Sequence, residues 1–188
     1  MLYEIGVSLS YMINRLRDRL NSAAPPVELA APHHSPKPAS PVSAADIDAV
    51  EKALGQRLPP LLTEIYRFVG NGGFGPGYGL TGLSGGATDD LGNDVLTLYR
   101  SFREADPEDP EWHWPSNLLP VCHLGDGMQI CVRLDDPTQG LVLFDPSGCG
   151  PGVSWEGAFR PISHDLASWL QAWLDGTSCL EAINYRAV

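Results

Sequence analysis

The sequence predicts an α+β fold in which helices come first, antiparallel strands follow and a helix closes the domain. Three observations support this class. Apolar residues recur at helical spacing up to residue 69, strand-like runs surround an Asp-Gly turn within residues 118–134, and helical spacing returns after residue 163. Helices and strands that are grouped rather than alternating indicate an α+β fold and not a parallel βαβ sheet.

Residues 1–22 are predicted to form an amphipathic helix, because their apolar side chains recur three and four positions apart. Residues 23–42 contain six prolines among small residues, which favours an extended linker. A helix on such a linker can dock on its own domain or on another chain, so a homodimer formed through this helix is one possible arrangement. The apolar residues of the helix are Leu2, Ile5, Leu9, Met12, Ile13, Leu16 and Leu20.

The remaining chain, residues 43–188, is predicted to be one domain that opens with two helices. Ser43 followed by Asp46 fits a capping box at the start of the first helix, and Gly55 ends that helix. The proline pair at 59–60 suits the first turn of the second helix, where a backbone N–H is not needed.

Three segments lie between the second helix and the predicted strands. Residues 70–86 contain nine glycines, so we expect an irregular loop there. The short apolar run at residues 94–100 fits either a strand or a helix. Residues 104–111, with the sequence EADPEDPE, are predicted to form an exposed acidic loop.

The clearest strand signal is a β-hairpin. Residues 118–123 and 128–134 are strand-like runs, and Asp126-Gly127 between them is a favoured two-residue turn. A third strand is predicted at residues 141–144 and a fourth at residues 154–161.

Helical structure is predicted again near the C-terminus. Ser163 is expected to cap a helix that buries Trp169 and Trp173 and ends at Gly176. A short final helix is predicted at residues 178–185.

The four cysteines form no CxxC pair, which is typical of ordinary thiols in a reducing compartment. Nothing at the start of the chain resembles a secretory signal, so we expect a cytoplasmic protein. In a regular hairpin around the Asp126-Gly127 turn, Cys122 and Cys131 would face each other. We expect them to be buried thiols and not a disulfide.

Acidic residues dominate the charge of the chain. Asp and Glu number 23 against 12 Lys and Arg, which gives a net charge of −11. Such a chain is repelled by nucleic acid phosphates and by anionic lipid, whereas a basic protein partner is favoured. We therefore expect neither direct nucleic acid binding nor membrane binding.

The run LGQRLPPLLTEIYRFVGNGG at residues 54–73 resembles the signature of the SMI1/KNR4 family, also called the SUKH superfamily. The later half agrees with this resemblance. Trp114 and the motif Leu118-Leu119-Pro120 precede the predicted hairpin, and residues 131–134 form its return strand.

This resemblance implies a single α+β domain with a central, mainly antiparallel sheet flanked by helices. It also implies similarity to bacterial immunity proteins, which bind and neutralise cognate toxins, many of them nucleases. Fungal relatives imply the alternative of a regulatory protein-interaction module with no toxin partner. No catalytic residues and no cofactor accompany the family, so a non-enzymatic protein is expected.

Acidic loops edged by tryptophan are the candidate surface for a basic partner, because interfaces concentrate binding energy in aromatic residues ringed by polar groups. The alternative is that these carboxylates only keep the protein soluble. The candidate residues are Asp89, Asp90, Glu104, Asp106, Glu108, Asp109, Glu111, Trp112, Asp126, Asp135 and Asp136. Of the tryptophans near the loop, Trp112 is expected to be the exposed one and Trp114 can belong to the core.

The sequence gives weak support for a dinucleotide site, a metal site or a Cys–His hydrolase. GxGxxG occurs twice within residues 70–82, but a helix precedes it where a dinucleotide site needs a strand. No histidine pair or EF-hand spacing indicates a metal site. Cys122 and His123 are neighbours on a predicted strand and would point to opposite faces, which disfavours a Cys–His hydrolase.

Overall fold

The computed structural model describes residues 2–22, 38–136, 138, 140–177, 181 and 183. Within that part of the chain, five α-helices accompany one four-stranded antiparallel sheet, which confirms the predicted α+β class. The strand order is β1-β2-β3-β4, so each strand pairs with its neighbour in sequence. The elements are α1 (Leu2–Asn21), α2 (Ala44–Leu54), α3 (Pro60–Phe68), α4 (Val95–Phe102), β1 (Leu118–Gly125), β2 (Met128–Arg133), β3 (Gly140–Phe144), the 3₁₀ turn η1 (Trp155–Ala158), β4 (Phe159–Asp165) and α5 (Leu166–Leu174).

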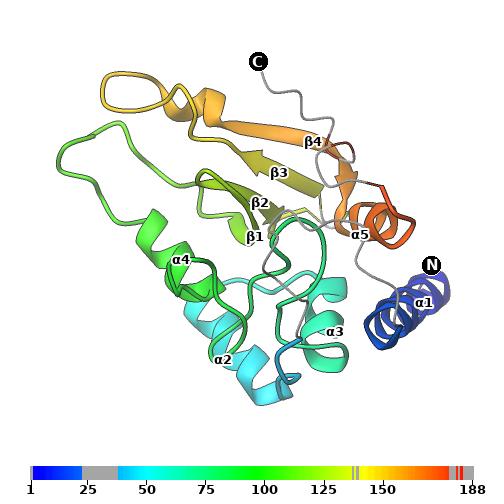
Figure 1. Ribbon diagram of the computed structural model, residues 1–188. Helices are drawn as coiled ribbons and strands as arrows, with labels where there is room; N and C mark the ends of the chain where they lie inside the picture. The colour runs from blue at the N-terminus through cyan, green and yellow to red at the C-terminus, as the bar shows by residue number, and fades with distance from the viewer. Residues whose placement is uncertain are drawn as a thin grey trace.

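The sheet and the helices form separate layers around one core. In Figure 1 the sheet occupies the upper part of the view, with α2, α3 and α4 beneath it and with α1 and α5 side by side at the right. Tyr66, Leu119, Ile130 and Trp169 are among the fully buried side chains of the core between these layers. At the left of the view, the sheet is bordered by the long loops before β1 and after β3.

β1 and β2 form the hairpin that the sequence predicts. Asp126 and Gly127 are the two turn residues, with φ of 50° and 78°, and Gly125 pairs with Met128. Positive φ at both positions is what a type I′ turn requires, and its twist matches that of antiparallel strands. The turn therefore fixes where the chain reverses and places Asp126 at its tip.

The predicted pairing of Cys122 with Cys131 is wrong. Cys122 pairs with Ile130 and Cys131 with Pro120, because β1 has an extra residue relative to β2 at two places. Each extra residue shifts the register by one, as in a β-bulge. Both cysteines are buried thiols, and burial raises the pKa of the Cys131 thiol.

The first helices of the domain begin and end where the sequence predicts. Ser43 and Asp46 form a reciprocal capping box at the start of α2, and Gly55 follows its end with φ of 71°. The side chain of Ser43 accepts a hydrogen bond from the Asp46 N–H at 3.2 Å. Pro60 is the first residue of α3, which buries its apolar face in the core.

The ambiguous run at residues 94–100 is helical. The Asp94 carboxylate accepts a hydrogen bond from the Thr97 N–H at 2.7 Å and caps α4. Such a cap satisfies one of the free N–H groups at a helix start. Val95, Leu98 and Tyr99 are the buried residues of this helix, and α4 packs against β1.

Two predictions near the C-terminus need correction. Asp165 and not Ser163 caps α5: its carboxylate accepts from the Ser168 N–H at 2.7 Å, whereas Ser163 lies in β4. The predicted fourth strand begins later than expected, because Trp155–Ala158 form the turn η1. Most of the predicted final helix, residues 178–185, lies outside the described residues.

Asn71 organises the glycine-rich loop. Its side chain is buried, accepts from the Leu83 N–H at 2.7 Å and donates to the Leu83 carbonyl at 3.3 Å. A Cβ on Gly86 would lie 2.4 Å from Asn71 Cγ, so only glycine allows this close approach. Leu80 further along the loop forms an isolated bridge with Cys122 of β1. The glycine-rich loop is therefore packed against the rest of the domain.

Helix α1 docks on its own domain, against α3 and α5. Arg17 Nε donates to the Phe68 carbonyl at 2.8 Å, and Arg15 Nη2 pairs with Asp175 Oδ1 at 3.0 Å. Among the described helices, none is long and apolar enough to cross a membrane. The side chains of α1 that join the core are Met12, Ile13 and Leu16. The predicted domain boundaries and a homodimer through α1 stay predictions.

Candidate functional site

A cluster of aromatic side chains joins the loops at one end of the sheet. Phe102 stacks on Trp114 with ring centroids 4.5 Å apart, and Trp112 meets Trp155 edge to face at 4.7 Å. Such pairs fix the relative positions of the segments that carry them. The aromatic cluster comprises Phe102, Trp112, Trp114, Phe144, Trp155 and Phe159. It therefore ties α4, the loop after it, the end of β3, η1 and β4 together.

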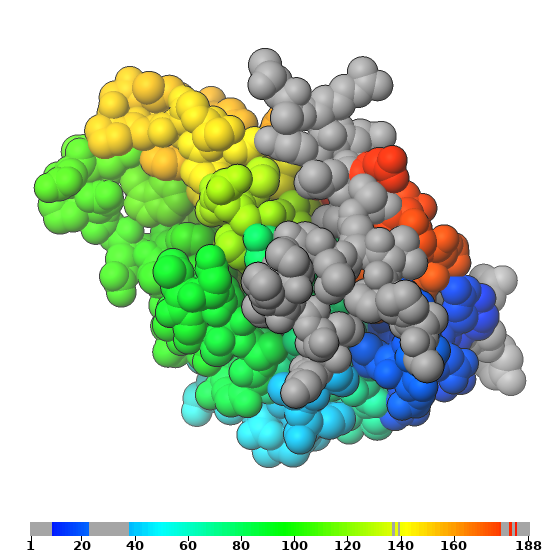
Figure 2. Space-filling model, viewed as in Figure 1, coloured from blue at the N-terminus to red at the C-terminus, as the bar shows by residue number. Residues whose placement is uncertain are grey.

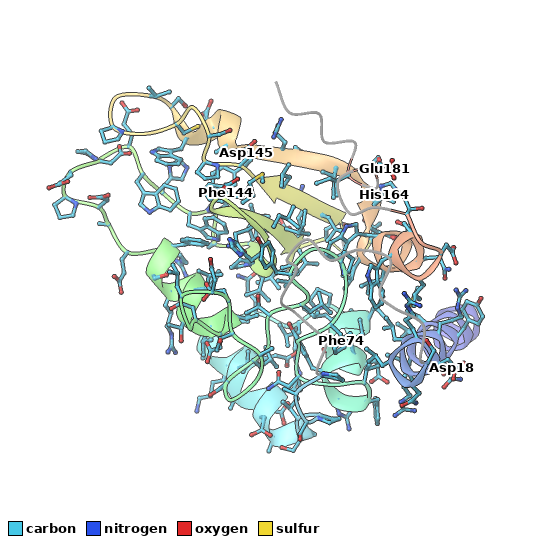
Figure 3. The ribbon with its side chains drawn as sticks, in the orientation of Figure 1. Asp18, Phe74, Phe144, Asp145, His164 and Glu181 are labelled. Atoms are coloured by element: carbon cyan, nitrogen blue, oxygen red, sulfur yellow. The ribbon has the colours of Figure 1, made fainter. Side chains whose placement is uncertain are left out.

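A cleft of about 520 Å³ opens beside the aromatic cluster. Phe102, Trp112, Phe144 and Trp155 supply apolar wall to it, and carboxylates from three loops supply charge. In Figure 2 the surface at the left of the view is hollowed between the segment around α4 and the loop that follows it. Figure 3 shows Phe144 and Asp145 at the end of β3, far from His164 beside α5. The volume is that of a typical ligand cleft.

Asp109 is the most buried of the described carboxylates that line the cleft. It is 3% exposed, and its Oδ2 accepts a hydrogen bond from the Trp155 indole N–H at 2.7 Å. Its Oδ1 is buried and has no hydrogen-bond partner among the described residues. The bond to Trp155 attaches the loop after α4 to η1. The predicted exposure of the whole acidic loop is therefore wrong at Asp109, whose carboxylate turns inward.

His123 and Gln129 come into the cleft from β1 and β2. His123 Nδ1 lies 3.6 Å from Asp90 Oδ1, and the His123 ring packs on Tyr78 with centroids 5.1 Å apart. Gln129 is 3% exposed. His123 Nδ1 and Gln129 Oε1 are buried without a hydrogen-bond partner in the described part of the chain.

The rim of the cleft is shaped by short loops with their own hydrogen bonds. Asp89 Oδ1 accepts from the N–H groups of Leu91 and Asn93 at 3.0 and 2.7 Å, which closes a turn. Asp106 Oδ1 accepts from the Glu108 N–H at 2.9 Å. Leu91 projects at this rim and is 81% exposed.

The structure brings together part of the predicted partner surface. Trp112 lines the cleft and is half-buried, so the expectation that it would be the exposed tryptophan holds only in part, whereas Trp114 is buried as a core residue. Glu104, Glu108 and Glu111 are exposed in the same loop but do not line the cleft. The predicted residues that line it are Asp89, Asp90, Asp106, Asp109, Trp112 and Asp126.

Asp135 and Asp136 lie apart from the cleft, after β2. Hydrogen bonds from Arg133 and Asn117 hold the pKa of Asp135 below its ordinary value. The side chain and N–H of Thr138 lower the pKa of Asp136 in the same way. The Asp136 carboxylate thus has its partners within this turn, whereas Asp135 also accepts from Asn117 just before β1, so both have a structural role there.

Sequence reasoning missed the side chains that the sheet contributes. His123, Gln129 and Phe144 are strand residues whose place at the cleft depends on tertiary pairing. Only for Trp155 does the sequence offer an indication, since an aromatic residue in a glycine-rich loop is a candidate for a binding surface. In the described ranges, no group of three or more His, Cys, Asp or Glu side chains is arranged to hold a metal ion.

The sequence matches the model of one known family, described as SMI1 / KNR4 family (SUKH-1), over residues 41–172. The match includes every strand of the sheet and the segments that line the cleft. No curated protein matches the sequence.

Proposed function

This chain belongs to the SMI1/KNR4 family (SUKH-1), and from that premise we propose that it is an immunity protein that binds a cognate bacterial toxin and neutralises it. The proposed action is non-enzymatic. The protein covers the active or substrate-binding surface of the toxin in the cytoplasm and catalyses no reaction itself.

The cleft is the observation that carries this proposal. It combines aromatic wall with carboxylates from three loops, and no Lys or Arg is among the described residues that line it. Interfaces gain most of their energy from buried aromatic groups, while charges around them steer and orient the partner. A basic toxin surface has the chemistry that complements this arrangement.

Negative charge contributes to inhibition in two ways. The net charge of −11 attracts a basic partner and raises the rate of encounter. A toxin that acts on nucleic acid has a positive surface for phosphates, and carboxylates at the cleft can occupy it. Steric exclusion of the substrate then suffices, and no bond needs to be made or broken.

Co-expression tests this function directly. The chain is produced with a toxin encoded beside its gene, and we expect restored growth and a complex that co-purifies. A complex with another protein and no rescue would favour the regulatory module instead. Neither rescue nor a complex would contradict the immunity proposal.

A matched pair of variants tests the role of the cleft. Asp90→Asn with Asp126→Asn removes two cleft carboxylates, whereas Glu108→Gln with Glu111→Gln removes two exposed ones outside it. Both doubles change the net charge equally. We expect the first double to weaken toxin binding by about tenfold or more and the second to change it by less than about threefold. Equal effects would mean that the cleft is not the contact surface.

A further inference from the structure

We propose that the cleft seats one arginine side chain of the bound partner, with its guanidinium held by Asp109 and Gln129 between aromatic walls. The identity of the partner rests on the proposed function, but the chemistry of the pocket does not. The proposal commits to a single planar cation as the anchor of the interface.

Unpartnered polar atoms point to a missing donor. Among the described residues, the buried side-chain atoms without a hydrogen-bond partner include Asp109 Oδ1, His123 Nδ1 and Gln129 Oε1, and all three residues line the cleft. The two oxygens can only accept hydrogen bonds. A buried acceptor without a donor costs free energy, so a ligand that donates to both oxygens removes that cost.

The negative charge of the Asp109 carboxylate favours a positively charged donor over a neutral one. Asp109 is 3% exposed and its carboxylate has the neutral indole of Trp155 as its described partner. Burial of a carboxylate without a cation is unfavourable, and this desolvation cost arises when the protein folds, before any partner binds. The partner's cation therefore meets a site that is already desolvated and already positioned, which favours binding.

The walls favour arginine over lysine. Trp112 and Trp155 pack edge to face at 4.7 Å and both line the cleft, so indole surface is available to a cation. A guanidinium stacks on aromatic faces and donates several hydrogen bonds in one plane. Asp109 comes from a loop and Gln129 from β2, and both line the cleft. A forked donor is the kind of group that bonds to two acceptors at once. The ammonium of lysine is a compact point charge and does not combine these contacts.

Size and rim charge agree with such an anchor. The cleft volume of about 520 Å³ admits a long side chain together with part of its backbone. Asp90, 61% exposed at its side chain, lies at the rim next to His123 and adds attraction as the cation approaches. The exposed Leu91 offers apolar contact to the segment that carries the arginine.

The test uses a small probe and the full chain. N-acetyl-arginine-N-methylamide is titrated into the ¹⁵N-labelled protein and followed by NMR. We expect saturable shifts at Asp109, Gln129 and the Trp155 indole, with a dissociation constant on the order of 1 mM. The neutral citrulline analogue and the lysine analogue should each bind about tenfold more weakly or worse. Equal shifts with all three probes would overturn the proposal.

Two substitutions make the assignment specific. Asp109→Asn keeps an acceptor for the Trp155 indole but removes the charge, and Glu108→Gln removes a charge from the same loop outside the cleft. Only the first should weaken arginine binding, by about tenfold. If Asp109→Asn does not fold, Gln129→Met removes the second acceptor with little change in size and should also weaken binding. Unchanged binding in folded variants would overturn the proposal.

The outcomes separate this inference from the proposed function. Arginine binding without any toxin complex would contradict the immunity role and support the pocket. A toxin complex with no arginine binding, and with full affinity in the Asp109→Asn variant, would support the immunity role and overturn the pocket.

Discussion

At the scale of single residues, the hydrogen bond from Trp155 to Asp109 has two effects. It satisfies one oxygen of a buried carboxylate, and it attaches the loop after α4 to η1. A buried carboxylate that loses its donor is left with its full desolvation cost. The indole N–H of Trp155 therefore stabilises the protein in addition to the burial of its ring.

Trp155→Phe removes the indole N–H but keeps an aromatic ring, so it tests the hydrogen bond separately from the burial of the ring. We expect a loss of about 1–3 kcal/mol in the free energy of unfolding, measured by urea denaturation. Trp112→Phe is the matched control, since the Trp112 indole forms no hydrogen bond with the described residues. Equal losses in the two variants would mean that the hydrogen bond to Asp109 adds nothing.

The sequence could not reveal the inward turn of Asp109. Within EADPEDPE every carboxylate has similar neighbours, and such a run is typical of solvated loops. What distinguishes Asp109 is Trp155, which lies 46 positions further along the chain. A partner at that separation becomes visible only when the fold brings the two segments together.

At the scale of elements, local chemistry predicted most boundaries well. The Ser43 capping box, the start at Pro60 and the Asp126-Gly127 turn each depend on residues within a few positions of one another. The register of β1 against β2 did not follow from the turn alone, because two extra residues in β1 shift it. The short run at 94–100 was ambiguous for a related reason, since its packing against β1 is tertiary.

Helix α1 gives a pH-dependent prediction at the same scale. Hydrogen bonds from Gln171 and Arg15 hold the pKa of Asp175 below its ordinary value of 3.8. A carboxyl whose pKa is lowered by folding stabilises the protein above the unfolded pKa and loses that contribution as pH falls through the folded pKa. Asp175→Asn should therefore be less stable than the wild type at about pH 6, and the difference should shrink below about pH 4.

Unfolding of both proteins in urea across this pH range measures that difference. Arg15→Gln removes the cation of α1 that pairs with Asp175 and should reduce the same pH-dependent difference. A gap between wild type and Asp175→Asn that stays constant down to about pH 3 would contradict the prediction.

At the scale of the whole molecule, the charge of the chain predicts how association responds to salt. The net charge is −11, and five aspartates line the cleft. Screening by salt weakens long-range attraction more than it weakens close contacts. We expect the association rate with a basic toxin to fall by about tenfold or more between about 0.05 and 0.5 M NaCl.

Stopped-flow or surface plasmon resonance measurements of both rate constants check this expectation. The dissociation rate should change much less than the association rate, since it reports contacts already made. An association rate that does not depend on salt would contradict electrostatic steering.

The candidate site itself was only partly predictable at this scale. Acidic composition and the nearby Trp112 led to a predicted partner surface, and six of its residues line one side of the cleft. The opposite wall comes from β1, β2, the end of β3 and η1, which meet only through the sheet topology. The family match covers these segments but does not by itself say which side chains face one another.

The uneven placement of the five tryptophans has a practical consequence. Trp112, Trp114 and Trp155 gather at the aromatic cluster, whereas Trp169 and Trp173 lie in α5. Intrinsic emission thus comes from one group of fluorophores beside the cleft, of which Trp112 and Trp155 line it, and from another inside the helical side of the core. With Trp169→Phe and Trp173→Phe combined, the remaining signal becomes a label-free optical report on whatever enters the cleft.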